Sequence, residues 1–329
     1  MVIRHHSPSH SSRPTASSAL KRRTSIATWH CCGASSSDAS CWTGEFSAVA
    51  GKCDIVCLQE TAPDLGCADV HEDFVCFQNV SNSNSCVAIL VHTSISNQVK
   101  WSSEECDELS SLTHSVGVDI EGIGFISAYF ADAEKPIQDF ISTIEQTKKM
   151  LEYMRRVRKI RRFVVAGDLN VEAQANVSNV TGPYCLKEWK VVQSQTSKSF
   201  TDDCKRVHEL MKLCTKYELC CPQTFCRTSR KGDFVHVNDA NEDVAELGIS
   251  DAQAWREHFT RAHWSVQARP SFSADDVSQL DYILFSQSIF DESSTNVRII
   301  NDLRIWNSDH FAVVVETEGV IQPKEKRIR

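Results

Sequence analysis

The chain has 329 residues, of which 41% are hydrophobic and 24% charged, and its formal net charge is -8 at pH 7. This composition is typical of a globular protein with one large core or two modest ones. No apolar run approaches the roughly 18 residues that a membrane helix needs, so we expect no stable membrane association. The negative charge argues against general attraction to nucleic acid, although local basic patches survive such an average.

The fifteen cysteines are scattered along the chain and odd in number, which argues against a secreted disulfide framework. Reduced thiols indicate an intracellular protein of the nucleus or cytoplasm. Four of them, Cys214, Cys220, Cys221 and Cys226, lie close enough in sequence to hold zinc, but their spacing matches no finger or ribbon.

Residues 1–24 are rich in serine, histidine and arginine and contain no acidic residue. We expect a disordered leader here, and a transit peptide is the alternative. From Ser25 onward nine short apolar runs alternate with turn-like residues: "SIATWH", "CDIVCLQE", "DFVCFQNV", "CVAILVHT", "SVGVDI", "IGFISAYF", "RFVVAGD", "LDYILF" and "FAVVVE". So many strands with few helices between them predict an α/β protein of two packed mixed sheets flanked by helices.

Apolar residues at helical spacing predict a helix over about 136–161, and a second helix is expected over 201–217. The basic residues of the first helix, among them Arg155, Arg156, Arg158 and Arg162, indicate either a solvated surface or a face that contacts phosphate. Residues 228–279 have the polar composition of a long loop or insertion, with a short helix over about 250–259. The predicted domain therefore spans 25–318, and 319–329 form a polar tail.

Four strand ends carry residues that can hold a cation or a phosphate. They supply Glu60, then Asp168 and Asn170, then Asp281, and finally Asp309 and His310. Each alone is more typical of a turn or a helix cap. Together, converging carboxylates need a cation or a proton to offset their repulsion, and oxygen ligands favour Mg²⁺ or Mn²⁺. Asp281 is the candidate partner that orients His310.

The ordered set "LQE", "GDLN", "LDYIL" and "SDH" resembles the exonuclease-endonuclease-phosphatase superfamily, which includes DNase I-like and AP endonuclease-like enzymes, over about 25–316. The resemblance implies a four-layer α/β sandwich with metal-assisted phosphodiester hydrolysis at one rim. It implies that Glu60 binds the cation and that Asp168, helped by Asn170, orients or deprotonates the attacking water. Asp309 would complete the metal shell, and the His310 and Asp281 pair would contact the scissile phosphate or move a proton. Tyr129 would lie near the phosphate.

One position departs from the superfamily pattern. The first strand usually ends in Trp-Asn, whereas "IATWHCCG" has His30 in place of the asparagine. An imidazole can ligate a metal, but it is bulkier and titrates near neutrality. His30 is therefore a doubtful metal ligand, and reduced or absent activity is an open alternative.

The segments between the motifs look like the endonuclease domains of non-LTR retrotransposons, notably "SCVAILVHTSI", "VVAGDLNVEAQ" with "TGPY", and "CCPQTFCR" before "LDYIL". This branch implies a monomeric enzyme that nicks DNA, with RNA the less favoured nucleic acid. The chain would then be a free-standing domain, a domesticated gene or a decayed copy. An RNA deadenylase or a phospholipid phosphodiesterase of the same fold is the alternative.

Overall fold

The fold was analysed in a computed structural model of the chain. The described residues are 23–34, 50–61, 73–79, 86–173, 177, 179–182, 200–225, 235–236, 260–262, 277–292, 295–300, 308, 310–318 and 320–321. Most of the predicted leader, the short helix over 250–259, most of the predicted insertion and most of the tail lie outside these residues, whereas Arg23 and Thr24, at the end of the predicted leader, form the start of a strand. The domain boundaries therefore remain predictions.

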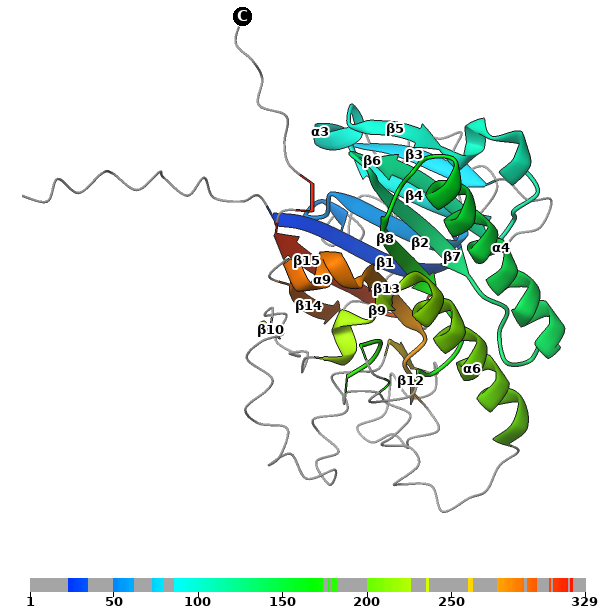
Figure 1. Cartoon of the computed structure of the whole chain (residues 1–329). Helices are drawn as coiled ribbons and strands as arrows, with labels where there is room; N and C mark the ends of the chain where they lie inside the picture. Colours follow the sequence, from blue (N-terminus) through cyan, green and yellow to red (C-terminus); the bar gives the residue numbers. More distant parts are fainter. Residues whose placement is uncertain are drawn as a thin grey trace, which may run out of the picture.

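Two mixed sheets form the centre of the protein (Figure 1). The seven-stranded sheet has the order β10-β14-β15-β1-β2-β4-β3. Its strands are β10 (Val235–His236), β14 (Thr295–Ile300), β15 (Ala312–Glu318), β1 (Arg23–Ala34), β2 (Ile55–Thr61), β4 (Cys86–His92) and β3 (Phe74–Asn79). Only β1 and β2 pair in parallel among these strands, and the other neighbours are antiparallel.

The six-stranded sheet has the order β5-β6-β7-β8-β13-β9. Its strands are β5 (Val99–Ser102), β6 (Ser115–Ile120), β7 (Ile123–Tyr129), β8 (Arg162–Asp168), β13 (Asp281–Ser286) and β9 (Leu219–Cys220). Strands β7 and β8 are parallel and side by side, so both end at the same rim. A separate two-stranded ladder joins β11 (Arg261–Ala262) to β12 (Val277–Ser278).

Successive side chains of a strand lie on opposite faces of the sheet, and side chains on both faces are buried. On β1, Ile26 belongs to the core between the sheets, whereas Ala27 and Trp29 belong to a cluster on the outer face of the seven-stranded sheet. Because that outer cluster is buried, this face is covered as well. On β8, Val164 points into the central core and Val165 points outward, towards the helices.

Two long helices, α4 (Ile137–Arg156) and α6 (Phe200–Tyr217), pack against each other, and α4 contacts β6 and β7 (Figure 1). The shorter helices are α3 (Thr93–Ser96), α9 (Gln287–Glu292), η3 (Ser103–Glu105), η4 (Asp107–Leu109) and η5 (Pro222–Thr224). The predicted extension of the first helix to Arg161 is wrong. The helix ends at Arg156, and the left-handed Lys159, with φ of 61°, turns the chain into β8.

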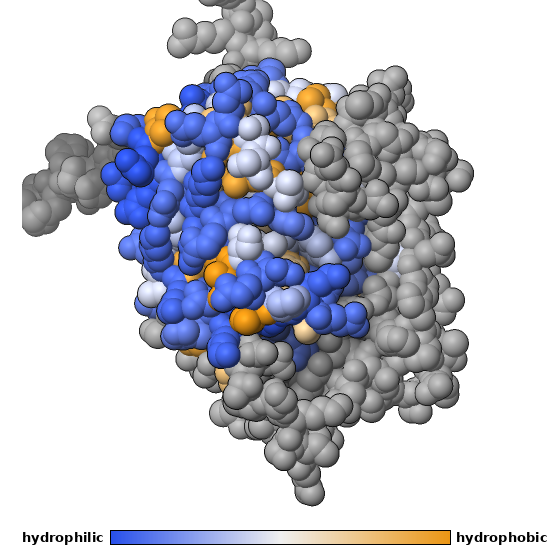
Figure 2. All heavy atoms as spheres, turned by 90° about the vertical axis from the view of Figure 1, so that its right-hand side faces the viewer, coloured by the Kyte–Doolittle hydropathy of each residue, from blue (hydrophilic) through white to orange (hydrophobic). Residues whose placement is uncertain are grey.

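The face that includes α4 and α6 is mostly hydrophilic, with small separate apolar areas (Figure 2). No helix in the described part of the chain is long and apolar enough to cross a membrane. The predicted arrangement of two packed mixed sheets with flanking helices is confirmed, and all nine apolar runs form strands. Strand β14, "TNVRII", was not predicted.

A chain of buried polar side chains joins the two sheets. Thr28 Oγ1 on β1 donates to Gln59 Oε1 on β2 at 3.2 Å. Gln59 Nε2 then donates to Ser127 Oγ on β7 at 3.1 Å, and that hydroxyl donates to the carbonyl oxygen of Leu58. All three side chains are fully buried, so each hydrogen bond replaces water that these groups would otherwise need.

Candidate active site

Three neighbouring strands bring Tyr129, Asp168 and Asp281 into one row. Asp168 pairs in register with Tyr129 across the parallel β7–β8 ladder and with Asp281 across the antiparallel β8–β13 ladder. Tyr129 belongs to the core between the sheets, and Asp168 and Asp281 each lie two residues from a residue of that core, Ala166 and Ile283, so all three side chains point between the sheets. The row lies at the carboxyl end of β8, where the sequence predicted half of a site.

Asn170 holds Asp168 in position. Its backbone N–H donates to Asp168 Oδ1 at 3.0 Å, and its side-chain amide donates to Asp168 Oδ2 at 3.1 Å and to the Phe130 carbonyl at 2.8 Å. Asn170 has a φ of 48°, in the left-handed region that asparagine tolerates better than most residues. Just before Asp168, a Cβ on Gly167 would lie 1.8 Å from the Ala128 carbonyl oxygen, so only glycine fits there.

Glu60 reaches the row from the other sheet because its backbone breaks the strand pattern. It has a φ of 51°, and the pairing register of β2 shifts between Gln59 and Thr61. Such a bulge changes the direction in which the side chain points. Tyr129 Oη donates to Glu60 Oε1 at 2.6 Å across the interface between the sheets.

His30 lies between the two carboxylates. Its Nε2 is 2.9 Å from Glu60 Oε2, and its Nδ1 is 3.5 Å from Asp168 Oδ2. The side chain is only 9% exposed. Neither ring nitrogen makes an aligned hydrogen bond with any described residue. Two buried nitrogens beside carboxylates are therefore available to a further group.

His310 completes the cluster from the amino-terminal side of β15. Its Nδ1 lies 2.9 Å from Asp281 Oδ2, and its Nε2 lies 4.0 Å from Asp168 Oδ2. Ser308 connects this residue to β1, because its hydroxyl donates to the His30 carbonyl at 2.8 Å and accepts from the His310 backbone N–H at 3.0 Å. The predicted pairing of His310 with Asp281 is thus present as a contact.

Burial and neighbouring charges shift the pKa values of the two carboxylates that flank His30 in opposite directions. Burial raises the pKa of Asp168 to about 6, and the nearby Asp281 adds to the rise while His310 and His30 oppose it. Burial also acts to raise the pKa of Glu60, but contacts with His30 and Tyr129 outweigh it and lower that pKa to about 2. Glu60 is therefore the readily charged carboxylate and Asp168 the one that titrates near neutrality.

Of the predicted site residues, His30, Glu60, Tyr129, Asp168, Asn170, Asp281 and His310 lie together, and Asp309 lies outside the described residues. Sequence reasoning missed Ser308 and His114. The His114 ring lies 6.1 Å from the Tyr129 ring, and burial lowers its pKa. Nothing in the surrounding "LTHSV" marks this histidine in the sequence, whereas Ser308 stands within the "SDH" motif itself.

The donor set fits a divalent cation. Glu60 supplies a carboxylate, His30 supplies buried nitrogens without an aligned partner, and Asp281 Oδ1 has no hydrogen-bond partner among the described residues. Carboxylate oxygens suit Mg²⁺ and Mn²⁺, and imidazole nitrogen extends the range towards later transition metals. Metal identity does not follow from these contacts alone.

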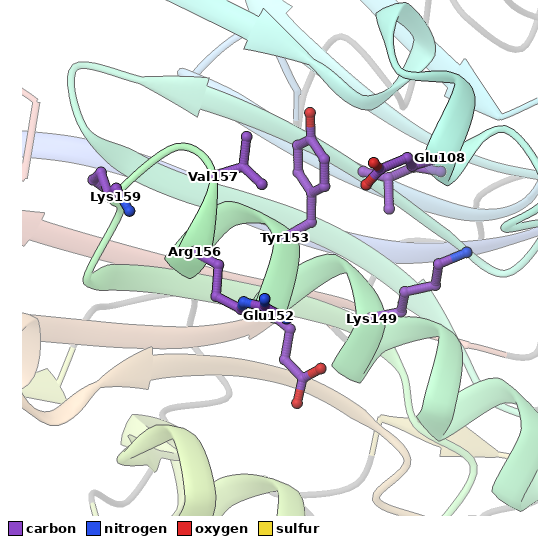
Figure 3. A pocket seen from close by; sticks show the side chains of 8 residues that line it. Glu108, Lys149, Glu152, Tyr153, Arg156, Val157 and Lys159 are labelled. Carbon is purple, nitrogen blue, oxygen red and sulfur yellow. The ribbon is translucent and has the colours of Figure 1, made fainter.

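The basic residues of α4 lie away from this cluster. Two of them, Lys149 and Arg156, border a hollow of about 650 Å³ that is also lined by Lys159, beyond the end of the helix, and by Glu108 and Glu152 (Figure 3). This hollow lies near the start of β8, and six residue steps, roughly 20 Å of strand, separate that end from Asp168. The solvated-surface interpretation is therefore favoured over phosphate contacts at the site.

The cysteine cluster shows no feature of a zinc site among its described members. Cys214, Cys220 and Cys221 are buried, and Cys226 lies outside the described residues. Burial raises the pKa of Cys214 to about 12 and also raises that of Cys220, which disfavours the thiolate form that zinc requires.

The two packed mixed sheets with flanking helices form a DNase I-like fold. No family model matches the sequence, and no curated protein matches it. Among solved structures, the AP endonuclease LMAP from Leishmania major has a TM-score of 0.58 and 14% identity, covering 93% of this chain and 92% of its own. The catalytic domain of Xenopus laevis APE2 has a TM-score of 0.56 and 15% identity, with coverages of 90% and 92%.

The endonuclease domain of TRAS1, a telomere-specific non-LTR retrotransposon, matches with a TM-score of 0.49 and 15% identity, covering 92% of this chain and 100% of that domain. A similarity at this level does not separate the retrotransposon branch from the AP endonucleases. The branch assignment therefore stays a prediction.

Proposed function

We propose that the chain is a divalent-metal-dependent phosphodiesterase that nicks DNA. The observation that supports this most is the convergence of His30, Glu60 and His310 from one sheet with Tyr129, Asp168 and Asp281 from the other. Phosphodiester hydrolysis needs an oriented water, compensation for charge on the phosphate oxygens and help for the leaving oxygen. The clustered residues have the chemical types for each requirement.

Asp168 is the proposed proton acceptor. With a pKa of about 6 it is mostly ionised between pH 7 and 8, yet basic enough to take a proton from an attacking water. Asn170 uses both its backbone N–H and its amide on this carboxylate or on Phe130, so it acts as a positioning residue.

The His310 and Asp281 pair is the proposed contact to the scissile phosphate. Asp281 accepts from Nδ1 of His310, which leaves Nε2 on the side of Asp168 to donate to a phosphate oxygen when protonated. Tyr129 donates to Glu60, and we assign it a positioning role on that carboxylate rather than a direct phosphate contact.

Glu60 and His30 Nε2 would hold the cation, Mg²⁺ or Mn²⁺, with Asp309 as a further proposed ligand. When bound, the cation would act as a Lewis acid on the phosphate. DNA is proposed over RNA from the retrotransposon-like segments, and a monomer in the nucleus or cytoplasm from composition.

The test is nicking of supercoiled plasmid in Mg²⁺ or Mn²⁺. Asp168→Ala is expected to lower the rate by about 100-fold or more, because a general base contributes about 10²–10⁴. Asp107→Ala, which removes an exposed aspartate of η4, is the matched control and is expected to retain activity. Equal nicking by the wild type and Asp168→Ala would exclude the proposed site.

A decayed enzyme is the second candidate, and the position of His30 favours it. Its imidazole stands between Glu60 and Asp168, close to both. If the wild type does not nick but His30→Asn does, the decayed copy is the better description. Parallel assays with polyadenylated RNA and sphingomyelin vesicles distinguish the other phosphoesterase activities.

A further inference from the structure

We infer that His30, Asp168 and His310 form a second metal position within the same cluster, for a transition-metal dication of which Zn²⁺ is the best fit. One ligand atom from each of these three residues lies within 4.8 Å of the other two. All three side chains are buried. This position involves Nδ1 of His30 and not Nε2, the nitrogen beside Glu60, and it uses two nitrogens and one oxygen.

The spacing of the donors supports a small tetrahedral ion. His30 Nδ1 and His310 Nε2 lie 3.5 Å and 4.0 Å from Asp168 Oδ2. Ligands around a tetrahedral ion with bonds of about 2.0 Å are about 3.3 Å apart. Octahedral Mg²⁺ requires about 2.9 Å between neighbouring ligands, which is further from the observed distances. The two imidazole rings are also close, with centroids 4.3 Å apart and an interplanar angle of 85°.

Each histidine has a carboxylate at the nitrogen that faces away from the proposed ion. Asp281 lies at hydrogen-bond distance from His310 Nδ1, at 2.9 Å, whereas Glu60 lies 2.9 Å from His30 Nε2 without an aligned hydrogen bond. Histidines that ligate metals almost always donate their second N–H to such a group, which fixes the tautomer and raises the basicity of the ligating nitrogen. The same contacts leave His30 Nδ1 without an aligned partner among the described residues and facing Asp168.

The two metal positions exclude each other at His30. A neutral imidazole has one nitrogen lone pair, so it ligates at Nδ1 or at Nε2 but not at both. Zinc on Nδ1 requires the proton on Nε2, the nitrogen that lies beside Glu60. The zinc site also occupies Asp168, the proposed proton acceptor, so zinc is expected to inhibit any Mg²⁺-supported nicking.

The test measures binding and does not require nuclease activity. Metal-free full-length chain is titrated with Co²⁺, whose visible absorption reports tetrahedral coordination, and Zn²⁺ is then added to displace it. One ion per chain is expected. His30→Asn should abolish the cobalt bands, whereas Glu60→Gln should keep them with about tenfold weaker binding, because only the orienting group changes. His208→Asn, which changes an exposed histidine of α6, is the control for nonspecific binding.

X-ray absorption of the zinc-loaded wild type supplies a measurement that does not depend on the folding of any variant. It should show two imidazole ligands and a carboxylate. The inference would be overturned if His30→Asn kept the cobalt bands, or if Glu60→Gln lost them while His30→Asn kept them. It would also be overturned if the zinc-loaded wild type showed fewer than two imidazole ligands. A chain that binds zinc in this way but never nicks DNA would uphold the inference and refute the proposed function.

Discussion

Replacing Asp168 by asparagine is expected to stabilise the metal-free fold at neutral pH while removing the proposed proton acceptor. The carboxylate is fully buried, and its pKa is about 6 compared with an ordinary value of 3.8. A shift of about two units corresponds to about 3 kcal/mol of unfavourable ionisation. Asparagine does not ionise but loses the hydrogen bond from the Asn170 amide, at a cost of about 1 kcal/mol. A net gain of about 2 kcal/mol is expected at pH 8.

The gain should depend on pH in a defined direction. The folded state holds the Asp168 proton more tightly than the unfolded chain, so the wild type loses stability as pH rises from about 4 through 6. At pH 4.5 the ionisation penalty is only about 1 kcal/mol, which the lost hydrogen bond cancels. The two proteins should therefore be about equally stable at pH 4.5 and differ by about 2 kcal/mol at pH 8.

Urea unfolding in EDTA at pH 4.5 and pH 8 measures the free energy of unfolding of both proteins. Subtracting the wild-type value from the variant value gives the effect of replacing this one carboxyl group. Asp119→Asn is the matched control, because Asp119 is a buried aspartate of the same sheet whose side chain pairs with Arg158 at 3.6 Å. That substitution should destabilise the fold. A difference between wild type and Asp168→Asn that does not change with pH would refute the electrostatic reasoning.

Two further substitutions test the local geometry. Gly167→Ala should destabilise the fold by about 3 kcal/mol, because the new Cβ would collide with the Ala128 carbonyl oxygen in the β7–β8 ladder. A decrease in the free energy of unfolding, measured in urea, of less than about 0.5 kcal/mol would contradict this. Tyr129→Phe should raise the pKa of Glu60 from about 2 towards its ordinary value, since the 2.6 Å hydrogen bond to the ionised form is lost, and NMR titration of the carboxyl carbon would detect it. A depressed carboxyl pKa stabilises the fold above about pH 4.5, and this stabilisation disappears as the pH falls towards 2. The Tyr129→Phe variant should therefore unfold at a higher pH than the wild type during acid titration. An unchanged midpoint of acid unfolding would count against the role of Tyr129.

The sequence could predict the site as far as strand ends could be identified. Apolar runs that end in Asp168, Asp281 and Glu60 are visible without a structure, and the parallel pairing of β7 with β8 places Tyr129 beside Asp168. His30, the position that departs from the superfamily pattern, lies between Glu60 and Asp168 in this cluster. Asp309 and the roles of all these residues remain predictions.

Features that depend on tertiary contacts could not be predicted. Simple alternation along β2 would put Glu60 on the outer face, and only its left-handed backbone and the adjacent register shift bring it inward. Strand β14 was missed because Asn296 and Arg298 interrupt the apolar run of "TNVRII", although β14 pairs with β15 over six residues. The sequence left open whether the basic helix face contacts phosphate, because a sequence does not show at which end of a sheet a helix terminates.

The polar chain through Thr28, Gln59 and Ser127 has a consequence for the precision of the site. Apolar faces in contact resist separation far more than they resist sliding, since a shift of a fraction of an ångström exposes little surface. Directional hydrogen bonds between the sheets do not tolerate such a shift. His30 and Glu60 belong to one sheet and Asp168 to the other, so the distances from Asp168 to His30 and Glu60 depend on the relative position of the two sheets. Gln59, a neutral residue next to Glu60 on β2, therefore determines how accurately the charged residues of the two sheets are positioned.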